Sequence, residues 1–120
     1  MKYMLMIYGN EAAMHGATKE QFGQMYAAYG AYTEAMKKAG AWVAGDPLQP
    51  TATASTVRVA DGKSKVVNGP YAETKEQLGG YYIIDVPDLD AALSWASRCP
   101  GASVGALEVR PLQDFASMRP

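Results

Sequence analysis

The sequence has one cysteine, one histidine and no long hydrophobic run, and each scarcity argues against a class of protein. Cys99 has no second cysteine with which to form an internal disulfide. A transition-metal site needs three or four ligands, and Cys99 and the distant His15 supply only two. The apolar run that follows Met1 is too short for a signal peptide or a spanning helix. We therefore expect a cytoplasmic protein without a bound metal, a cofactor or a membrane segment.

Clusters of basic residues are also missing. The eleven Lys and Arg residues are scattered and the net charge is -1, so the chain lacks the positive patch that binding to nucleic-acid phosphates requires. A length of 120 residues allows one hydrophobic core and argues against a second. We expect a single domain over residues 1–115, followed by a C-terminal tail at 116–120.

The hydrophobic pattern that is present predicts an α+β fold with an antiparallel sheet. Strands are expected at Lys2–Tyr8, Trp42–Ala44, Thr56–Val59, Ser64–Val67, Leu78–Val86 and Val104–Arg110. A long helix begins after a capping box of Thr18 and Gln21, and a second helix begins after Asp88. Asp61 and Gly62 form a hairpin turn. This order gives β-α-β-β-α-β with an extra short strand, the ferredoxin-like arrangement.

Two of the expected strands, Lys2–Tyr8 and Tyr81–Val86, are apolar on both faces. Two helices cover only one face of such a sheet, so the other face needs a second cover. The simplest cover is an identical sheet across a two-fold axis. We therefore predict a homodimer whose sheets pack face to face.

The stretch from Asn68 to Gly80 combines a turn, a cluster of charge and a glycine pair. Glu73, Lys75 and Glu76 come just before the glycine pair, where a bulge or a close backbone approach is expected. One interpretation places these three charges at the rim of a cleft. The alternative is that they are solvated surface charges of little energetic consequence.

Four segments, GPYAETKEQLGGYYIIDVPDLDAALSWASRCP, MKYMLMIYGNEAA, GDPLQPTATASTVRV and LEVRPL, resemble the YCII-related family, in particular its branch named for a DGPF tetrad. The resemblance implies a dimeric α+β barrel of ferredoxin-like subunits. It also implies small-molecule chemistry or binding beside the sheet, because the wider superfamily includes cofactor-free oxygenases, muconolactone isomerases and dehydrochlorinases. Relatives of the DGPF branch that are associated with sigma factors imply a regulatory context instead.

The sequence departs from the family pattern at two places. Asn68 and Tyr71 stand where the tetrad has Asp and Phe, so position 68 lacks the carboxylate that a proton-transfer role requires. Members of the wider family carry a His on the first long helix and an Asp after the next strand, proposed as a catalytic dyad. Asp46 matches the Asp, but the helix here has no His. The only histidine, His15, lies in a segment expected to be a loop. It acts there as an acid or base, or it is simply an exposed loop residue.

Eight tyrosines are a further unusual feature. Tyr26, Tyr29 and Tyr32 have the spacing of a helix stripe, which is more often core than site, and one of Tyr81 and Tyr82 must face away from the helices. The resulting candidate site has Asp46, Glu73, Lys75 and Glu76 as catalytic residues and Tyr8, Arg58 and Tyr82 as ligand-binding residues.

Two functions remain open from these residues. The first is a small-molecule-binding dimer with a cofactor-independent enzymatic site, in which Asp46 or Glu73 is the general base, Lys75 or Arg58 stabilises an oxyanion and Tyr82 donates a hydrogen bond. The second is a non-catalytic module that binds a metabolite or a transcription partner.

Overall fold

The computed structural model describes residues 1–118, so part of the tail expected at 116–120 lies outside the described residues. The elements in chain order are β1 Lys2–Gly9, α1 Glu11–His15, α2 Lys19–Lys38, β2 Trp42–Pro47, η1 Thr51–Thr53, β3 Ser55–Ala60, β4 Lys63–Asn68, β5 Gln77–Asp85, α3 Leu89–Arg98, η2 Pro100–Ser103, β6 Ala106–Pro111 and η3 Phe115–Met118, where η marks a 3-10 helix. The expected α+β class is confirmed.

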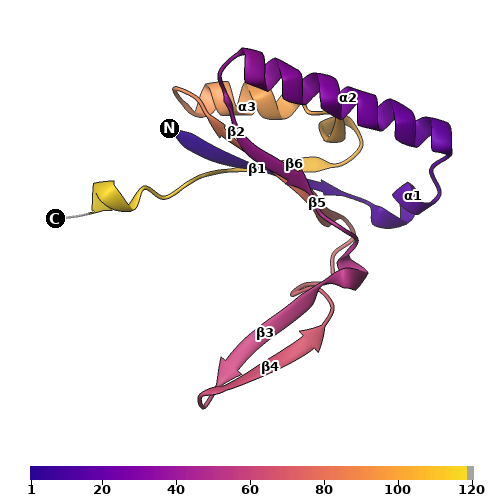
Figure 1. The fold of residues 1–120 in the computed structure, drawn as a ribbon, viewed down its shortest axis with the longest axis vertical. Helices are drawn as coiled ribbons and strands as arrows, with labels where there is room; N and C mark the ends of the chain where they lie inside the picture. The colour runs from indigo at the N-terminus through magenta and orange to yellow at the C-terminus, as the bar shows by residue number, and fades with distance from the viewer. Residues whose placement is uncertain (119–120) are drawn as a thin grey trace.

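Four strands form the main sheet in the order β2-β5-β1-β6, and each neighbouring pair is antiparallel. The two central strands, β5 and β1, are those whose sequences are apolar on both faces. Helix α2 connects β1 to β2 and helix α3 connects β5 to β6, a connectivity compatible with a ferredoxin-like fold. Both helices lie on the same face of the sheet, and the other face carries none (Figure 1).

The β3–β4 hairpin differs from the expectation, because it forms a separate two-stranded sheet. The short strand expected at Trp42–Ala44 instead continues to Pro47 and forms an edge of the main sheet. The turn itself is confirmed, since Asp61 has a φ of 53° and Gly62 a φ of 75°. Two successive positive φ values are what a two-residue type I′ turn requires.

The helix starts agree with the sequence, with one addition. Thr18 accepts a hydrogen bond from the Gln21 N–H, and the Gln21 side chain accepts one from the Thr18 N–H, which confirms the capping box. The Asp88 carboxylate caps α3 by accepting from the Ala91 N–H at 2.9 Å. The addition is α1, a single turn that ends at His15. This histidine is thus helical and exposed, and not part of a loop.

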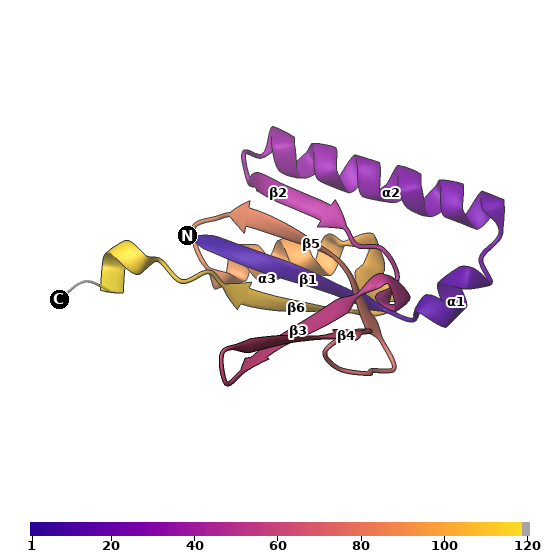
Figure 2. The ribbon, with the colours of Figure 1, turned by 60° about the horizontal axis from the view of Figure 1, so that its bottom comes forward.

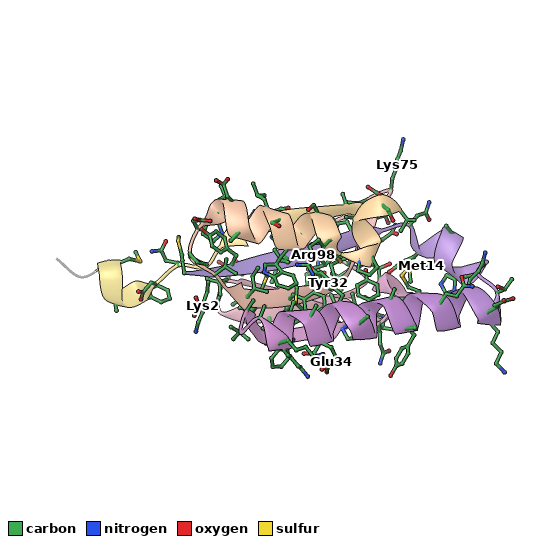
Figure 3. The ribbon with its side chains drawn as sticks, turned by 90° about the horizontal axis from the view of Figure 1, so that it is seen from above. Lys2, Met14, Tyr32, Glu34, Lys75 and Arg98 are labelled. Atoms are coloured by element: carbon green, nitrogen blue, oxygen red, sulfur yellow. The ribbon has the colours of Figure 1, made fainter. Side chains whose placement is uncertain are left out.

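The core lies between the main sheet and the two helices. Leu5 on β1, Met36 on α2 and Ile84 on β5 are completely buried. Tyr32 lies between α2 and α3, where its hydroxyl donates to the Trp95 carbonyl oxygen at 2.6 Å (Figure 3). The expected helix stripe is only partly core, since Tyr26 is 84% exposed. The N-terminal turns of α2 extend past α3, so side chains there lack a facing helix (Figure 3).

The hairpin gives the molecule an extended shape. It stands off from the sheet on the side that carries no helix (Figures 1 and 2). The Cα radius of gyration is 16.7 Å, whereas a compact domain of this length has a value of about 13.6 Å. We call the helix-free side of the main sheet the open face. Hairpin and open face together leave a large part of the surface without internal packing.

Candidate functional site

A pocket of about 340 Å³ lies where the hairpin joins the rest of the chain. Its lining comes from both sides of the hairpin and consists of Thr51, Ala52, Pro70, Ala72, Glu73, Thr74 and Gln77. We call it the hairpin-root pocket. Its volume falls at the small end of the range found for ligand sites, so it fits a small metabolite.

The wall before the hairpin is fixed by Glu11 of α1. One oxygen of the Glu11 carboxylate accepts the Thr51 N–H at 2.8 Å, and the other accepts the Thr51 hydroxyl at 2.7 Å. Asn10 caps the single helical turn on which Glu11 lies, since its side chain accepts from the Ala13 N–H. The capped turn therefore holds a carboxylate against a segment that is forty residues away in the sequence.

The wall after the hairpin is fixed by Gln77, the first residue of β5. Its side-chain oxygen accepts the Glu11 N–H at 3.0 Å, while its side-chain nitrogen donates to the Thr74 carbonyl oxygen at 2.7 Å. The Thr74 hydroxyl donates to the Glu76 carbonyl oxygen. Glu11 and Gln77 thus connect the two walls, and the polar groups of Thr51, Thr74 and Gln77 are already in use.

Glu73 differs from the rest of the lining. Its carboxylate makes no hydrogen bond or ion pair with any residue in the range 1–118. The hydroxyl protons of Thr51 and Thr74 and the Gln77 amide are engaged in the scaffold, so the exposed Glu73 is the charged acceptor that the lining leaves without a partner. A carboxylate in this position can accept a hydrogen bond or a proton from a bound molecule.

Asp46 lies outside this pocket, on the open face. Its carboxylate accepts a hydrogen bond from the Tyr81 hydroxyl at 3.1 Å, across the β2–β5 pair. This hydrogen bond raises the pKa of Tyr81 above its ordinary value, because it stabilises the protonated phenol. Tyr81 is four residues along β5 from Gln77, or about 13 Å on an extended strand. Asp46 and Glu73 therefore do not share one site.

Tyr82 points to the opposite side of the sheet from Tyr81. It is buried under the helices at 8% exposure, and its hydroxyl forms a hydrogen bond of 2.9 Å with Thr33 of α2. Burial raises the pKa of Tyr82. Tyr82 therefore belongs to the core, and Tyr81 is the tyrosine of this pair that faces away from the helices.

The remaining candidates lie apart from one another. Lys75 and Glu76 are exposed and outside the pocket lining, and Lys75 extends away from the body of the protein (Figure 3). The Arg58 guanidinium lies over the Tyr71 ring at 5.4 Å, next to the hairpin. Tyr8 follows Met4 and Met6 on β1 at alternate positions, which places it on the open face. Of the charge cluster, the structure brings only Glu73 into a pocket.

The glycine pair supplies the expected irregularity. The pairing of β1 with β5 skips Gly79, so this residue forms a bulge between Leu78 and Gly80. A Cβ on Gly80 would approach the Asp46 carbonyl oxygen to 3.2 Å and the Pro47 Cα to 3.3 Å. Gly80 thus allows the end of β2 to lie against β5, just before the chain continues from β2 to the pocket.

A half-buried tyrosine, Tyr29 of α2, lies beside the buried Cys99, which follows the last residue of α3. Burial raises the pKa of Tyr29 and of the Cys99 thiol, whose sulfur lies 3.8 Å from the Tyr29 hydroxyl. Both groups are therefore neutral near pH 7. A thiol held in its protonated form is a weak nucleophile, in agreement with a packing role for Cys99.

Two features are absent from residues 1–118, a metal-binding cluster and a membrane-spanning helix. No group of three or more His, Cys, Asp or Glu side chains in this range has the geometry to hold a metal ion. No helix in the same range is long and apolar enough to cross a membrane.

Glu11 and Gln77 are the residues that sequence reasoning missed. The signal for Glu11 is local and weak: an Asn followed by an acidic residue indicates a short capped turn. Nothing in the sequence indicates that this carboxylate reaches Thr51, because the contact depends on the path of the chain between them.

The sequence matches the YCII-related domain over residues 1–116. The chain belongs to the YCII-related family. An uncharacterized protein of Rhizobium meliloti (strain 1021) is 38% identical over 114 residues, which cover 93% of this chain and 92% of the relative. The resemblance inferred from the sequence is therefore confirmed at the level of the family.

Membership in the YCII-related family leaves the reaction undefined. The His and Asp dyad of the wider family is absent here, because α2 has no histidine and Asp46 is paired with Tyr81. The hairpin-root pocket is therefore the basis for assigning chemistry to this YCII-related protein.

Proposed function

We propose that this protein is a homodimer that binds a small polar molecule in the hairpin-root pocket. The single observation that carries the proposal is the free Glu73 carboxylate in a pocket whose other polar side chains are fixed by hydrogen bonds. A preformed wall with one unpartnered carboxylate favours a ligand that carries an amine or hydroxyl donor.

The same carboxylate supports a cofactor-independent reaction at this site. A ligand group that hydrogen-bonds to Glu73 has its proton within reach of the carboxylate, so Glu73 can act as a general base when that group reacts. Ala52, Pro70 and Ala72 supply the apolar part of the lining, which favours a ligand with a small hydrocarbon portion. Proton transfer to Glu73 is the step that we assign to an enzymatic role, and binding does not depend on it.

The open face supports the homodimer. Met4 and Met6 of β1 lie opposite Ile83 and Tyr81 of β5, and all four are only half-buried. Polar groups border this apolar strip on both sides, the Asp46 carboxylate at one and the ion pair between Glu108 and Arg110 at the other. An apolar centre with a polar rim is the usual anatomy of a protein interface.

The exposed area supports it as well. The chain exposes 8740 Å², whereas a folded monomer of 12.8 kDa exposes about 6,300 Å². The excess of about 2,400 Å² per chain is of the order that obligate dimers bury. We therefore infer that a second copy covers the open face, with the two sheets about 10 Å apart.

The ligand proposal is tested by screening small amines, alcohols and hydroxy acids with ligand-observed NMR. Any binder is then titrated into Glu73→Gln and into the matched control Glu76→Gln, whose side chain lies outside the pocket. We expect at least a tenfold loss of affinity in the first variant and none in the second, because only Glu73 accepts from the ligand. Equal affinities in both variants would remove Glu73 from the site.

A further inference from the structure

The β3–β4 hairpin has two chemically different faces. The register pairs Val57 with Val66 and Arg58 with Lys65. Since side chains alternate along each strand, Val57, Val59 and Val66 share one face, which we call the valine face. The opposite face carries Arg58, Lys65 and Lys63, together with Val67.

The valine face is uncovered within residues 1–118. Its three valines are 59%, 69% and 61% exposed, in the order Val57, Val59 and Val66. A two-stranded hairpin is marginally stable by itself in water and needs further packing of an apolar face. The basic face already has a partner within the chain, because the Arg58 guanidinium lies over the Tyr71 ring and the Thr56 hydroxyl donates to the Gly69 carbonyl oxygen. The valine face is therefore the one that requires a partner.

We propose that the hairpin is a dimerisation arm, whose valine face packs against the flank of the second copy of this chain. This inference rests on the proposed homodimer and adds a second contact surface to it.

The position of the hairpin favours a second copy as the occupant. The hairpin stands on the side of the sheet where the open face lies, so a molecule seated on that face is flanked by it (Figures 1 and 2). A six-residue strand spans about 20 Å, and packed sheets are about 10 Å apart. The arm is thus long enough to pass the partner's sheet. By two-fold symmetry, each copy holds the other in this way.

The area supports the same occupant. The excess of about 2,400 Å² per chain includes the hairpin, since apart from Thr56 every residue of β3 and β4 is exposed. A contact limited to the open face would leave the three valines in water. A contact that also includes the arms covers both apolar surfaces in one assembly.

The test compares two neighbouring valines on opposite faces, Val66→Thr and Val67→Thr. Threonine keeps the shape and the strand preference of valine and removes apolar surface. Burial of one valine corresponds to about tenfold in affinity, and the symmetric dimer contains the substitution twice. We expect Val66→Thr to raise the dimer dissociation constant about 100-fold and Val67→Thr to change it less than about threefold, measured by sedimentation velocity over a dilution series.

Amide hydrogen exchange of the full chain supplies a second measurement. In the wild-type dimer we expect the β3–β4 amides to exchange at least about 100-fold more slowly than in Val66→Thr at a concentration where that variant is monomeric. Fast exchange of these amides in a wild-type dimer would overturn the arm. Equal dissociation constants for the two variants would overturn the arm and leave the dimer standing. A wild-type protein that stays monomeric would overturn both.

Discussion

The Glu11 carboxylate accepts two hydrogen bonds from Thr51, which we call the clamp. We expect a measurable loss of stability at the hairpin root when the clamp is removed. The perturbation is Glu11→Ala, which removes both acceptors of the Thr51 N–H and hydroxyl. A hydrogen bond to a charged group contributes about 1.5–3 kcal/mol. Because Glu11 is only half-buried, we use the lower value for each bond and expect a loss of about 3 kcal/mol.

Glu11→Gln should give an intermediate loss of stability, because the amide keeps one of the two acceptor oxygens and replaces the other with an NH2 group. We expect it to cost about 1.5 kcal/mol, half of the alanine effect. The matched control is Glu34→Gln on α2, where the side chain points away from the body, and its expected effect is below about 0.5 kcal/mol (Figure 3).

The assay is urea denaturation at a fixed protein concentration, combined with hydrogen exchange at the Thr51 amide. If the hairpin root unfolds together with the main sheet and its helices, the loss of the two hydrogen bonds lowers the free energy of unfolding. If the root opens locally, the loss speeds exchange of the Thr51 amide instead. If Glu11→Ala left both the unfolding free energy and the Thr51 exchange rate at their wild-type values, the two hydrogen bonds would not stabilise the hairpin root.

Three further predictions follow from the packing. Leu5→Ala should cost about 3 kcal/mol in urea denaturation and Phe22→Ala less than about 1 kcal/mol, because Leu5 is fully buried and Phe22 is 52% exposed; similar losses would contradict the core described above. Burial raises the pKa of Tyr29 and Tyr32, so their contribution to stability is complete below about pH 10 and is lost as the pH rises through the raised values. Phenolate absorbance should therefore rise first for the exposed tyrosines and again when circular dichroism reports unfolding, and a single ordinary step would count against the burial. Gly62→Val should speed amide exchange in β3 and β4 without changing the urea midpoint of the body, because a positive φ costs a β-branched residue about 1–2 kcal/mol.

The local elements of the fold were predictable because their signals are local. Asp61 and Gly62 set the hairpin turn, Thr18 and Gln21 form the capping box, and Asp88 caps the last helix. Each of these features depends on residues within about one turn of one another. The family match has a different basis, a likeness to the YCII-related domain that extends over residues 1–116.

The sheet to which each strand belongs was less predictable. Alternation in Thr56–Val59 indicates a strand with two different faces, but it carries no information about the sheet that the strand joins. Tyr81 and Tyr82 show the same limit, because β5 is apolar on both faces and either residue satisfies the pattern. Only the packing of Tyr82 under α2 decides between them.

The arrangement of the candidate side chains could not be predicted from the sequence. The structure places Glu73 in a pocket, Asp46 on the open face and Lys75 pointing into solvent. Convergence of side chains depends on the long-range path of the chain, which in this protein is set by Glu11 and Gln77. These contacts join segments separated by 40 and 66 residues, so no local pattern predicts them.

The mass of the protein in solution is the most direct test of the proposed homodimer. The excess exposed area, the apolar strip on the open face and the uncovered valines are the observations on which the proposed second copy rests. Sedimentation equilibrium at micromolar concentration should give twice the chain mass of 12.8 kDa. A mass of 12.8 kDa under the same conditions would contradict the account.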